Sequence, residues 1–392
     1  MAKTKVIALA IEIEWPYKHH QDLLKGILKF ARPLGWRCEF APFLGVKDAG
    51  KSEAYDGIIG RVTPQLERHA RKHGIPTVNV WLNSPVNTLP NVFPDVAAAG
   101  EMAAASFLSR GYRRFGFVGV KSDVNSNRML LEGFSKPIEA RRFALSLQWW
   151  VGETMGDAHA WKSFQESMCH WMQNSTFPIA VLCGNDVIAR YFAESCLRAG
   201  LRIPQDVAIM GVGNMDISCE MSEPRLSSIE FGFERVGHQA ASLLEQMKTD
   251  CRKPSSTILI PPAGVVTRTS TDAFVVTDPD VEKAMRVIQA RSKSPVSITD
   301  VLAEVPLSRR TLERRFREIL GCTIYDEITR SHVERAKHFL VTTRHPLKWV
   351  AIRAGFSDPR RLSIVFRKAE NITPREYRFR HGKRSPSSTQ TD

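Results

Sequence analysis

Cysteine is scarce in this sequence and is not arranged for pairing. The 392 residues contain 7 cysteines, an odd and widely scattered set, and no two of them form a Cys-x-x-Cys pair. This spacing argues against a zinc ribbon and against a disulfide framework, and it favours a reducing compartment. His19 and His20 stand together without cysteine or carboxylate partners at ligand spacing, so we predict no metal site and no cofactor.

Long apolar runs are missing as well. The apolar segment that starts at Val6 is interrupted by Glu12 and Glu14, which makes it too short and too acidic for a secretion signal. No other stretch reaches the roughly 18 apolar residues that a membrane-spanning helix needs. The sequence therefore predicts a cytoplasmic protein without a membrane partner.

Catalytic motifs are nearly absent. The sequence has no Gly-x-Ser-x-Gly, His-Glu-x-x-His or Ser-x-x-Lys segment. The segment Gly45–Ser52 does satisfy the phosphate-binding P-loop pattern, but that chemistry needs a helix directly after the loop. Only four residues separate Ser52 from the strand expected at Gly57, which leaves no room for such a helix. We predict that the protein is not an enzyme, with an ATP-binding enzyme as the alternative.

Positive charge, in contrast, is abundant and unevenly placed. The chain has 55 Lys and Arg against 41 Asp and Glu, a formal net charge of +14. Residues 281–392 hold 24 of the basic and 12 of the acidic residues, so residues 1–280 are close to neutral. A small basic part on a near-neutral large part is typical of a regulated nucleic-acid binder. A nonspecific basic DNA-binding protein is the alternative that charge alone leaves open.

The hydrophobic pattern divides the chain at the same place. Buried-strand patterns such as Lys5–Ile13 and Val207–Val212 alternate with helical ones such as Val96–Arg110, which predicts doubly wound parallel sheets covered by helices on both faces. After the turn-rich segment Thr277–Asp280 only helical patterns remain. We predict an α/β part over residues 1–272, a linker at 273–280, an all-α domain over 281–380 and a disordered tail at 381–392.

The all-α part contains one pattern twice. Val301–Ser308 and Val350–Ser357 each read as a short amphipathic helix, a tight turn, an apolar residue and a capping serine. In the helix that follows, a leucine and a phenylalanine four residues apart face inward and turn the arginines outward. Two such helix-turn-helix units suit two major grooves of double-stranded DNA, about 34 Å apart. The residues expected at the DNA are Ser308, Arg309, Arg310, Glu313, Arg314 and Arg317 in the first unit and Asp358, Pro359, Arg360, Arg361, Ser363 and Arg367 in the second.

The second unit and its continuation carry a family resemblance. The segment Leu347–Arg378, which ends Ile-Thr-Pro-Arg-Glu-Tyr-Arg, resembles the AraC/XylS-type transcription regulators, whose seven-helix domain ends in a Thr-Pro-x-x-Tyr-Arg signature. The resemblance covers about residues 280–380. It implies base contacts from Arg310, Glu313 and Arg314 in the first unit and from Pro359, Arg360 and Ser363 in the second.

Three positions depart from that family's pattern. Pro306 stands where the first turn usually has glycine, and because proline cannot adopt a positive φ, that turn must be built differently. Leu302 replaces a small residue, which predicts a wider spacing of the first helix pair. Asn371 replaces a late glycine, and asparagine tolerates the left-handed conformation better than most residues.

The large part matches another pattern at its strand ends and turns. The matching segments are Asn91–Asp95, Arg110–Phe117, Val181–Asp186, Gly200–Val207, Pro224–Ile229 and Arg268–Thr271. Together they resemble the LacI-type regulators and the periplasmic sugar-binding proteins over most of residues 5–271. This resemblance implies a two-lobed α/β sensor that closes on a ligand at the carboxyl ends of its strands.

The order of the two parts narrows the resemblance further. A sensor of this type followed by an AraC-type domain resembles the xylose operon regulators. That resemblance implies a sequence-specific transcription regulator of carbohydrate catabolism, an activator by family analogy, with D-xylose or another small sugar as effector. It also implies a homodimer that binds operator or promoter DNA, contacts RNA polymerase and is associated with the nucleoid.

Sugar contacts are implied at positions that follow strands. Carboxylates and amides take sugar hydroxyls, while aromatic rings pack on the apolar faces of the sugar. A helix cap, turn or surface role is an equally open interpretation of each position, and Asp186 in particular could cap a helix beginning near Val187. The implied contacts are Glu14, Trp15, Tyr17, Asp95, Asn185 and Asp186.

Two departures affect the identity of the sugar. Gly213 stands where the family has a sugar-binding aspartate, and Asn214 is the nearest polar substitute. Leu130 stands where an arginine is expected, and Arg128 is the nearest basic substitute. Losing a charged partner should weaken or redirect hydroxyl recognition, so the fold is expected to carry over better than the ligand.

Overall fold

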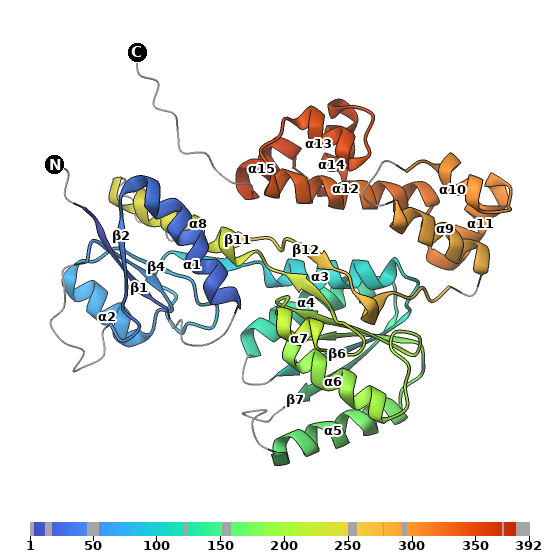
Figure 1. Cartoon of the computed structure of the whole chain (residues 1–392), viewed down its shortest axis with the longest axis horizontal. Helices are drawn as coiled ribbons and strands as arrows, with labels where there is room; N and C mark the ends of the chain where they lie inside the picture. Colours follow the sequence, from blue (N-terminus) through green and yellow to red (C-terminus); the bar gives the residue numbers. More distant parts are fainter. Residues whose placement is uncertain are drawn as a thin grey trace.

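The computed structural model describes residues 4–11, 18–44, 55–120, 124–150, 158–249, 257–276, 278–291, 296–370 and 372–381. These residues form two α/β lobes followed by a helical domain (Figure 1). The P-loop-like segment at 45–52, the three residues Glu14, Trp15 and Tyr17, and Asn371 lie outside the described residues.

The first lobe is built on a six-stranded sheet of order β11-β5-β4-β3-β1-β2 in which every pair is parallel. Side chains of β1 alternate between the two faces of this sheet. Ile7 and Leu9 pack with α1 and α8, whereas Ala8 packs on the opposite face with Leu66 of α2. The elements are β1 (Val6–Ala10), α1 (Lys18–Ala31), β2 (Arg37–Phe40), β3 (Gly57–Gly60), α2 (Pro64–His73), β4 (Thr77–Asn79), β5 (Asn91–Pro94), α8 (Phe233–Thr249) and β11 (Thr257–Ile260).

The second lobe repeats this plan with a sheet of order β12-β10-β9-β8-β6-β7. Its strands are parallel except β12, which pairs antiparallel with β10 at the edge. Helices α5 and α6 cover one face around Phe164 and Phe192, and α3 and α4 cover the other around Phe107 and Phe134. The elements are α3 (Val96–Leu108), β6 (Arg114–Val120), α4 (Val124–Glu139), β7 (Ala144–Trp150), α5 (Ala158–Gln173), β8 (Ile179–Cys183), α6 (Asp186–Arg198), β9 (Val207–Val212), α7 (Asp216–Glu220), β10 (Ser227–Glu230) and β12 (Gly264–Val266).

The chain passes between the two lobes three times. It leaves the first lobe between β5 and α3, returns between β10 and α8, and leaves again between β11 and β12. These three crossings form the hinge between the lobes. The two doubly wound lobes confirm the predicted fold class, with the antiparallel β12 as the one addition to the predicted parallel sheets.

The helical domain is divided into two cores that share one long helix. Ile324 and Ile328, early in α12, pack with α9, α10 and α11, whereas Val333 and Leu340, later in α12, pack with α13, α14 and α15. The predicted pair of helix-turn-helix units is therefore confirmed. The helices are α9 (Pro279–Ala290), α10 (Ile298–Glu304), α11 (Arg309–Leu320), α12 (Ile324–Thr342), α13 (Leu347–Ala354), α14 (Pro359–Glu370) and α15 (Pro374–His381).

The segment that joins the sensor to the helical domain is packed on both. Phe274 and Val276 contact the core of α9 to α11, while Val275 contacts the core of the second lobe. The amide of Val275 donates to the carbonyl of Arg110, 2.8 Å away. Figure 1 shows α12 lying along the sensor above α3 and the β11–β12 crossing. The helical domain thus rests on the hinge side of the two lobes.

Candidate functional site

One lysine joins the two lobes where the carboxyl ends of their strands meet. Lys18 is the first residue of α1 in the first lobe. Its Nζ lies 2.9 Å from the carbonyl of Asn214, 3.2 Å from Glu230 Oε2 and 3.3 Å from Asp216 Oδ1, all in the second lobe. Burial alone would lower the pKa of Lys18, but the carboxylates of Glu230 and Asp216 outweigh it and raise that pKa. A charged lysine therefore bridges the facing strand ends of the two lobes, which we call the cleft.

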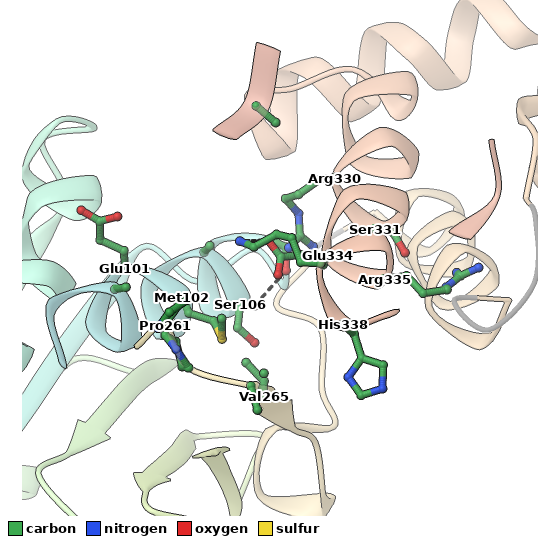
Figure 2. Close-up of a pocket in the computed structure, with 18 of the residues that line it drawn as sticks. Glu101, Met102, Ser106, Pro261, Val265, Arg330, Ser331, Glu334, Arg335 and His338 are labelled. Carbon is green, nitrogen blue, oxygen red and sulfur yellow. Dashed lines mark hydrogen bonds and ion pairs between the residues drawn. The ribbon is translucent and has the colours of Figure 1, made fainter. Parts of the chain in front are cut away.

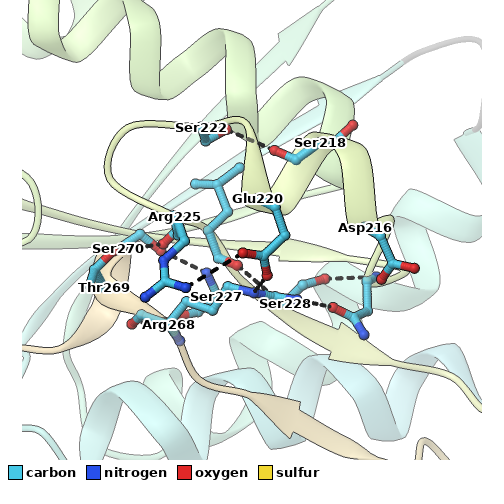
Figure 3. A network of polar contacts seen from close by, with 12 residues as sticks. Asp216, Ser218, Glu220, Ser222, Arg225, Ser227, Ser228, Arg268, Thr269 and Ser270 are labelled. Atoms are coloured by element: carbon cyan, nitrogen blue, oxygen red, sulfur yellow. Dashed lines mark hydrogen bonds and ion pairs between the residues drawn. The ribbon is translucent and has the colours of Figure 1, made fainter.

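A buried arginine holds the second-lobe side of this bridge in place. Arg268 Nη2 donates to Asn214 Oδ1 at 3.0 Å, and Asn214 Nδ2 donates to Glu230 Oε2 at 2.8 Å. The Arg268 guanidinium also donates to Glu220 and to the carbonyl of Leu226, and Figure 3 shows it between these groups. Its side chain is only 12% exposed. Asn214 was expected here from the sequence, whereas Lys18, Glu230 and Arg268 were not.

The first-lobe side of the cleft carries an aromatic face and a second cation. Arg61 follows β3, Trp81 follows β4, and the Arg61 guanidinium carbon lies 4.7 Å from the centre of the Trp81 ring. His19 lies next to Lys18 with its ring centre 5.1 Å from that of Phe233. Burial and the neighbouring charges of His20 and Arg61 lower the pKa of His19 to about 4, so this imidazole is neutral at pH 7. The sequence pointed to His19 only as a discounted metal ligand, and it did not point to Arg61 or Trp81 because neither belongs to a motif.

The structure gives Asp186 a different role from the expected sugar contact. Its side chain is fully buried, Oδ1 accepts from Ser228 Oγ at 2.6 Å, and Oδ2 accepts from the amide of Met215 at 2.7 Å. Burial raises the pKa of Asp186 to about 6 against these hydrogen bonds. The carboxylate therefore joins β10 to the segment that follows β9, and we do not propose it as a direct sugar contact. The expected cap of α6 is Asn185 instead.

Asp95 and Asn185 both cap helices that begin directly after strands. Asp95 Oδ1 accepts from the amide of Ala98 at 2.9 Å at the start of α3, directly after β5. Asn185 Oδ1 accepts from the amide of Ile188 at 2.9 Å at the start of α6, after β8. Both are half-buried at carboxyl ends of strands, which leaves them in position for a ligand while they also serve the backbone.

The two departures from the sugar-binding pattern have structural reasons. Leu130 is 1% exposed and packs in the core of the second lobe, while Arg128 is exposed on α4. Gly213 has φ +115°, a conformation that an aspartate would adopt only with strain, and Asn214 follows with φ +50°. The cleft therefore lacks both of the family's charged sugar partners at these positions.

In the first helix-turn-helix unit, two of the five arginines of α11 pair with glutamates of the same helix. Ser308 caps the helix by accepting from the amide of Thr311 at 3.3 Å. Arg309 Nε lies 2.9 Å from Glu313 Oε1, and Arg314 Nη1 lies 2.9 Å from both carboxylate oxygens of Glu318. Arg310 and Arg317 are exposed on the same helix. Contact with DNA here would compete with these intrahelical pairs.

The second unit presents a more purely basic face on α14. Asp358 Oδ1 accepts from the amide of Arg361 at 2.8 Å, and this bond together with that from Ser357 lowers the pKa of Asp358. Arg361 also donates to the Tyr325 hydroxyl, and Ser363 Oγ donates to the carbonyl of Pro359 at 2.8 Å. The remaining predicted contacts, Arg360 and Arg367, are exposed.

The turns of the two units are built differently, as Pro306 indicated. In the first, Val305 ends α10 with φ −114° and ψ 125°, and the amide of Leu307 donates back to the carbonyl of Val305 at 2.8 Å. This tight turn around Pro306 needs no positive φ. In the second, Gly355 has φ +99° and its amide closes the last turn of α13. Leu302 is half-buried against the core of the first unit.

We expect Gly355→Ala to destabilise the second unit by about 2 kcal/mol, because an alanine there adopts an unfavourable φ and crowds its neighbours. A Cβ at this position would lie 2.5 Å from His332 Nε2. Thermal unfolding of the full chain would show the loss. Gly321→Ala is a matched control: that glycine also has a positive φ, but nothing lies within 4 Å of its would-be Cβ, so its cost should be smaller. Equal costs would contradict the crowding argument.

A cavity of about 1260 Å³ lies between the sensor and α12. Burial and the nearby charge of Arg330 lower the pKa of Arg110 at the end of α3 to about 10. Arg110 is held by the carbonyls of Thr271 and Ser106, and Arg330 by Glu327. The helix shared by both DNA-binding units therefore faces the hinge. Figure 2 shows Glu101, Met102 and Ser106 on α3, Pro261 and Val265 from the crossing, and Arg330, Ser331, Glu334, Arg335 and His338 on α12.

The described ranges carry neither a metal-binding cluster nor a membrane-spanning helix. Among these residues, no group of three or more His, Cys, Asp and Glu side chains is arranged to hold a metal ion. None of the helices in the same part of the chain combines the length and the apolar character that crossing a membrane requires.

Both parts of the chain are similar to known protein domains. Residues 104–271 match the periplasmic binding protein-like domain, and residues 301–380 match a helix-turn-helix domain. The xylose operon regulatory protein of Haemophilus influenzae is 28% identical over 292 residues, 74% of this chain and 75% of that protein. Its counterpart in Escherichia coli K12 is 31% identical over 218 residues, which is 56% of each chain.

A solved structure extends the similarity to nearly the whole fold. The structure of a xylose-binding transcription activator covers 97% of this chain and 100% of its own, with a TM-score of 0.59 and 23% sequence identity. These similarities confirm the prediction of a DNA-binding transcription regulator rather than an enzyme. They do not support the ATP-binding and nonspecific DNA-binding alternatives.

Proposed function

We infer that this chain, which resembles the xylose operon regulators in both of its parts and in their order, is a sequence-specific transcription regulator controlled by a small sugar-type effector. One observation carries the proposal: a helical domain with two basic helix-turn-helix faces rests, through α12, on the hinge of a two-lobed sensor. Such an arrangement links the spacing of two DNA-reading helices to the closure of the lobes.

The proposed effector is a small polyhydroxy compound bound between the lobes. The cleft offers cations, carboxylates, amides and an aromatic face, which together suit hydroxyl groups and the apolar face of a sugar ring. D-xylose is the first candidate because the similar proteins carry that name, although Gly213 and Leu130 replace two of the family's charged partners. The proposed contacts are Lys18, Arg61, Trp81, Asp95, Asn185, Asn214 and Glu230, with Glu14, Trp15 and Tyr17, which follow β1 in the sequence, and Arg128, which is exposed.

Thermal unfolding of the full chain against pentoses, hexoses and their phosphates tests the effector. A ligand at 100 times its Kd adds about 2.7 kcal/mol to the free energy of unfolding, which is readily measured. A shift with D-xylose would support the first candidate, and a shift with another sugar would reassign the effector. If no compound in the panel shifts the transition, the sugar-sensor part of the proposal fails while the DNA-binding part stands.

We propose that the regulator acts as a homodimer and as an activator of transcription. A homodimer would place four helix-turn-helix units on operator DNA, and activation would require contact with RNA polymerase. Effector binding would shift the population of lobe arrangements and, through the three crossings and α12, the orientation of the DNA-binding units. A ligand that binds the sensor without changing the DNA footprint or affinity would defeat this coupling.

Arg360 and Lys368, two of the exposed cations of α14, are expected to affect DNA binding differently. Arg360→Ala should reduce discrimination at one base position by about 1–3 kcal/mol, because an arginine near the start of the helix suits the edge of a guanine. Lys368→Ala should weaken binding to all sequences alike, because a lysine later in the helix suits a phosphate. Selection from randomised duplexes at about 150 mM salt, followed by anisotropy titrations, measures both. Equal losses on all sequences from both variants would contradict the assignment of Arg360.

A further inference from the structure

The outer face of α14 carries an apolar side chain at its centre. Ile364 is 55% exposed, whereas Leu362 and Phe366 on the inner face of the same helix are completely buried. One turn before Ile364 stands Arg360, and one turn after it stands Lys368, both exposed. A single exposed isoleucine is not unusual in itself. What distinguishes Ile364 is its position, at the centre of the basic face of a helix that is proposed to enter a DNA groove.

The cations around Ile364 are available to a polyanion. Within the described residues, no salt bridge involves Arg360, Arg367 or Lys368. These side chains occupy positions four before, three after and four after Ile364, so all four lie on one side of the helix. The charge of this face is complementary to the phosphates that border a DNA groove. Ile364 would then point at the floor of the groove, between the bordering phosphates.

We propose that Ile364 recognises the 5-methyl group of a thymine in the major groove. This inference rests on the proposed function of the helical domain as a reader of duplex DNA. The thymine methyl is the one apolar group that base pairs display in the major groove, and aliphatic side chains contact it. An isoleucine has no hydrogen-bonding group in its side chain, so it discriminates through the methyl group and not through base-edge donors or acceptors.

The first unit has a different residue at the matching position. Aligning Leu312 with Leu362 and Phe316 with Phe366 places Arg314 opposite Ile364 in the repeated pattern. Arg314 is charged and lies 2.9 Å from the carboxylate of Glu318. An arginine in the groove favours guanine, whereas an isoleucine favours thymine. The two units therefore read different bases, and the half-sites of one protomer are not expected to be identical.

Uracil substitution tests the proposal, because uracil differs from thymine only in lacking the methyl group. The full-length protein is used to select a binding site from randomised duplexes, and each thymine of that site is then replaced singly by uracil. One position is expected to show binding about four-fold weaker, as for removing one methyl-sized group from an apolar contact. In Ile364→Ala this uracil penalty should disappear while the overall site preference remains.

Two further variants make the outcome decisive. Ile352→Ala truncates another exposed isoleucine, 51% exposed on α13, and should keep the uracil penalty. Ile364→Arg gives α14 the residue found in α11 and should replace the thymine preference with guanine at that position. The proposal is overturned if no thymine responds to uracil substitution, or if the penalty persists in Ile364→Ala with an unchanged melting temperature. Failure to select any site would instead count against the proposed function itself.

Discussion

Gly237→Ala should destabilise the first lobe by about 3 kcal/mol, although helix propensity alone predicts a gain of about 1 kcal/mol from the same change. Gly237 lies within α8, where it faces α1. A Cβ at this position would lie 1.9 Å from the carbonyl oxygen of Leu23, a backbone atom that cannot turn away. Gly26 of α1 is in the reciprocal position, because a Cβ added there would lie 1.9 Å from the carbonyl oxygen of Glu234. The two helices approach so closely because neither has a side chain at the crossing.

Urea denaturation of the full chain, followed by circular dichroism, measures this loss. Gly74→Ala is the matched control, since that glycine has φ +64° and nothing within 4 Å of a Cβ. The control should cost only about 1–2 kcal/mol from the left-handed conformation. A stabilised Gly237→Ala would show that α1 and α8 do not pack as described. It would also remove the reason for placing Lys18, at the start of α1, beside the second lobe.

Arg268→Ala is expected to cost the second lobe about 3 kcal/mol, because it removes a largely buried guanidinium and leaves the carbonyl of Leu226 and the buried amide of Asn214 without their donor. The guanidinium lies 2.7 Å from Glu220 Oε1, 2.9 Å from the carbonyl of Leu226 and 3.0 Å from Asn214 Oδ1. Arg268→Lys should recover only part of the loss, because an ammonium cannot reach acceptors on three sides with the fixed fork of a guanidinium. Effector binding should weaken in both variants, since Asn214 would lose the group that orients its amide.

Urea denaturation and a titration with the identified effector test this expectation together. Arg202→Ala is the control: its guanidinium also pairs with a carboxylate, Asp206, but its side chain is 72% exposed. An exposed pair of this kind contributes about 0–1 kcal/mol. Similar losses from the two variants would mean that the Arg268 network is no stronger than a surface ion pair. An unchanged effector affinity in Arg268→Ala would remove Asn214 from the proposed contacts.

Much of this architecture could be predicted from the sequence. The strand Val207–Val212 was predicted with the bounds that the structure gives it, because buried parallel strands are short apolar runs between turns. The second helix-turn-helix unit was predicted from Leu362 and Phe366, which are buried as the helical period requires. The excess of basic residues after residue 280 and these local patterns both indicated a separate DNA-binding domain.

The candidate site was predicted less completely. Asp95 and Asn185 were placed correctly at strand ends, but their oxygens also cap helices. Asp186, one residue after the cap, is buried and links two strands. The sequence motif does not distinguish this linking role from a contact with a ligand. Both roles use the same carboxylate at the same distance from a strand, so their sequence patterns coincide.

The two fold classes, their order and the basic character of the second domain can be predicted from the residues, because each follows from local periodicity and composition. The folded chain is needed to show that α8 and β11 belong to the first lobe, why Gly26 and Gly237 lie inside helices, and what Lys18 contacts. Lys18 and Glu230 are 212 residues apart. Their pairing depends on three chain crossings that bring distant strand ends together, and such long-range proximity leaves no periodic trace in the residues that take part.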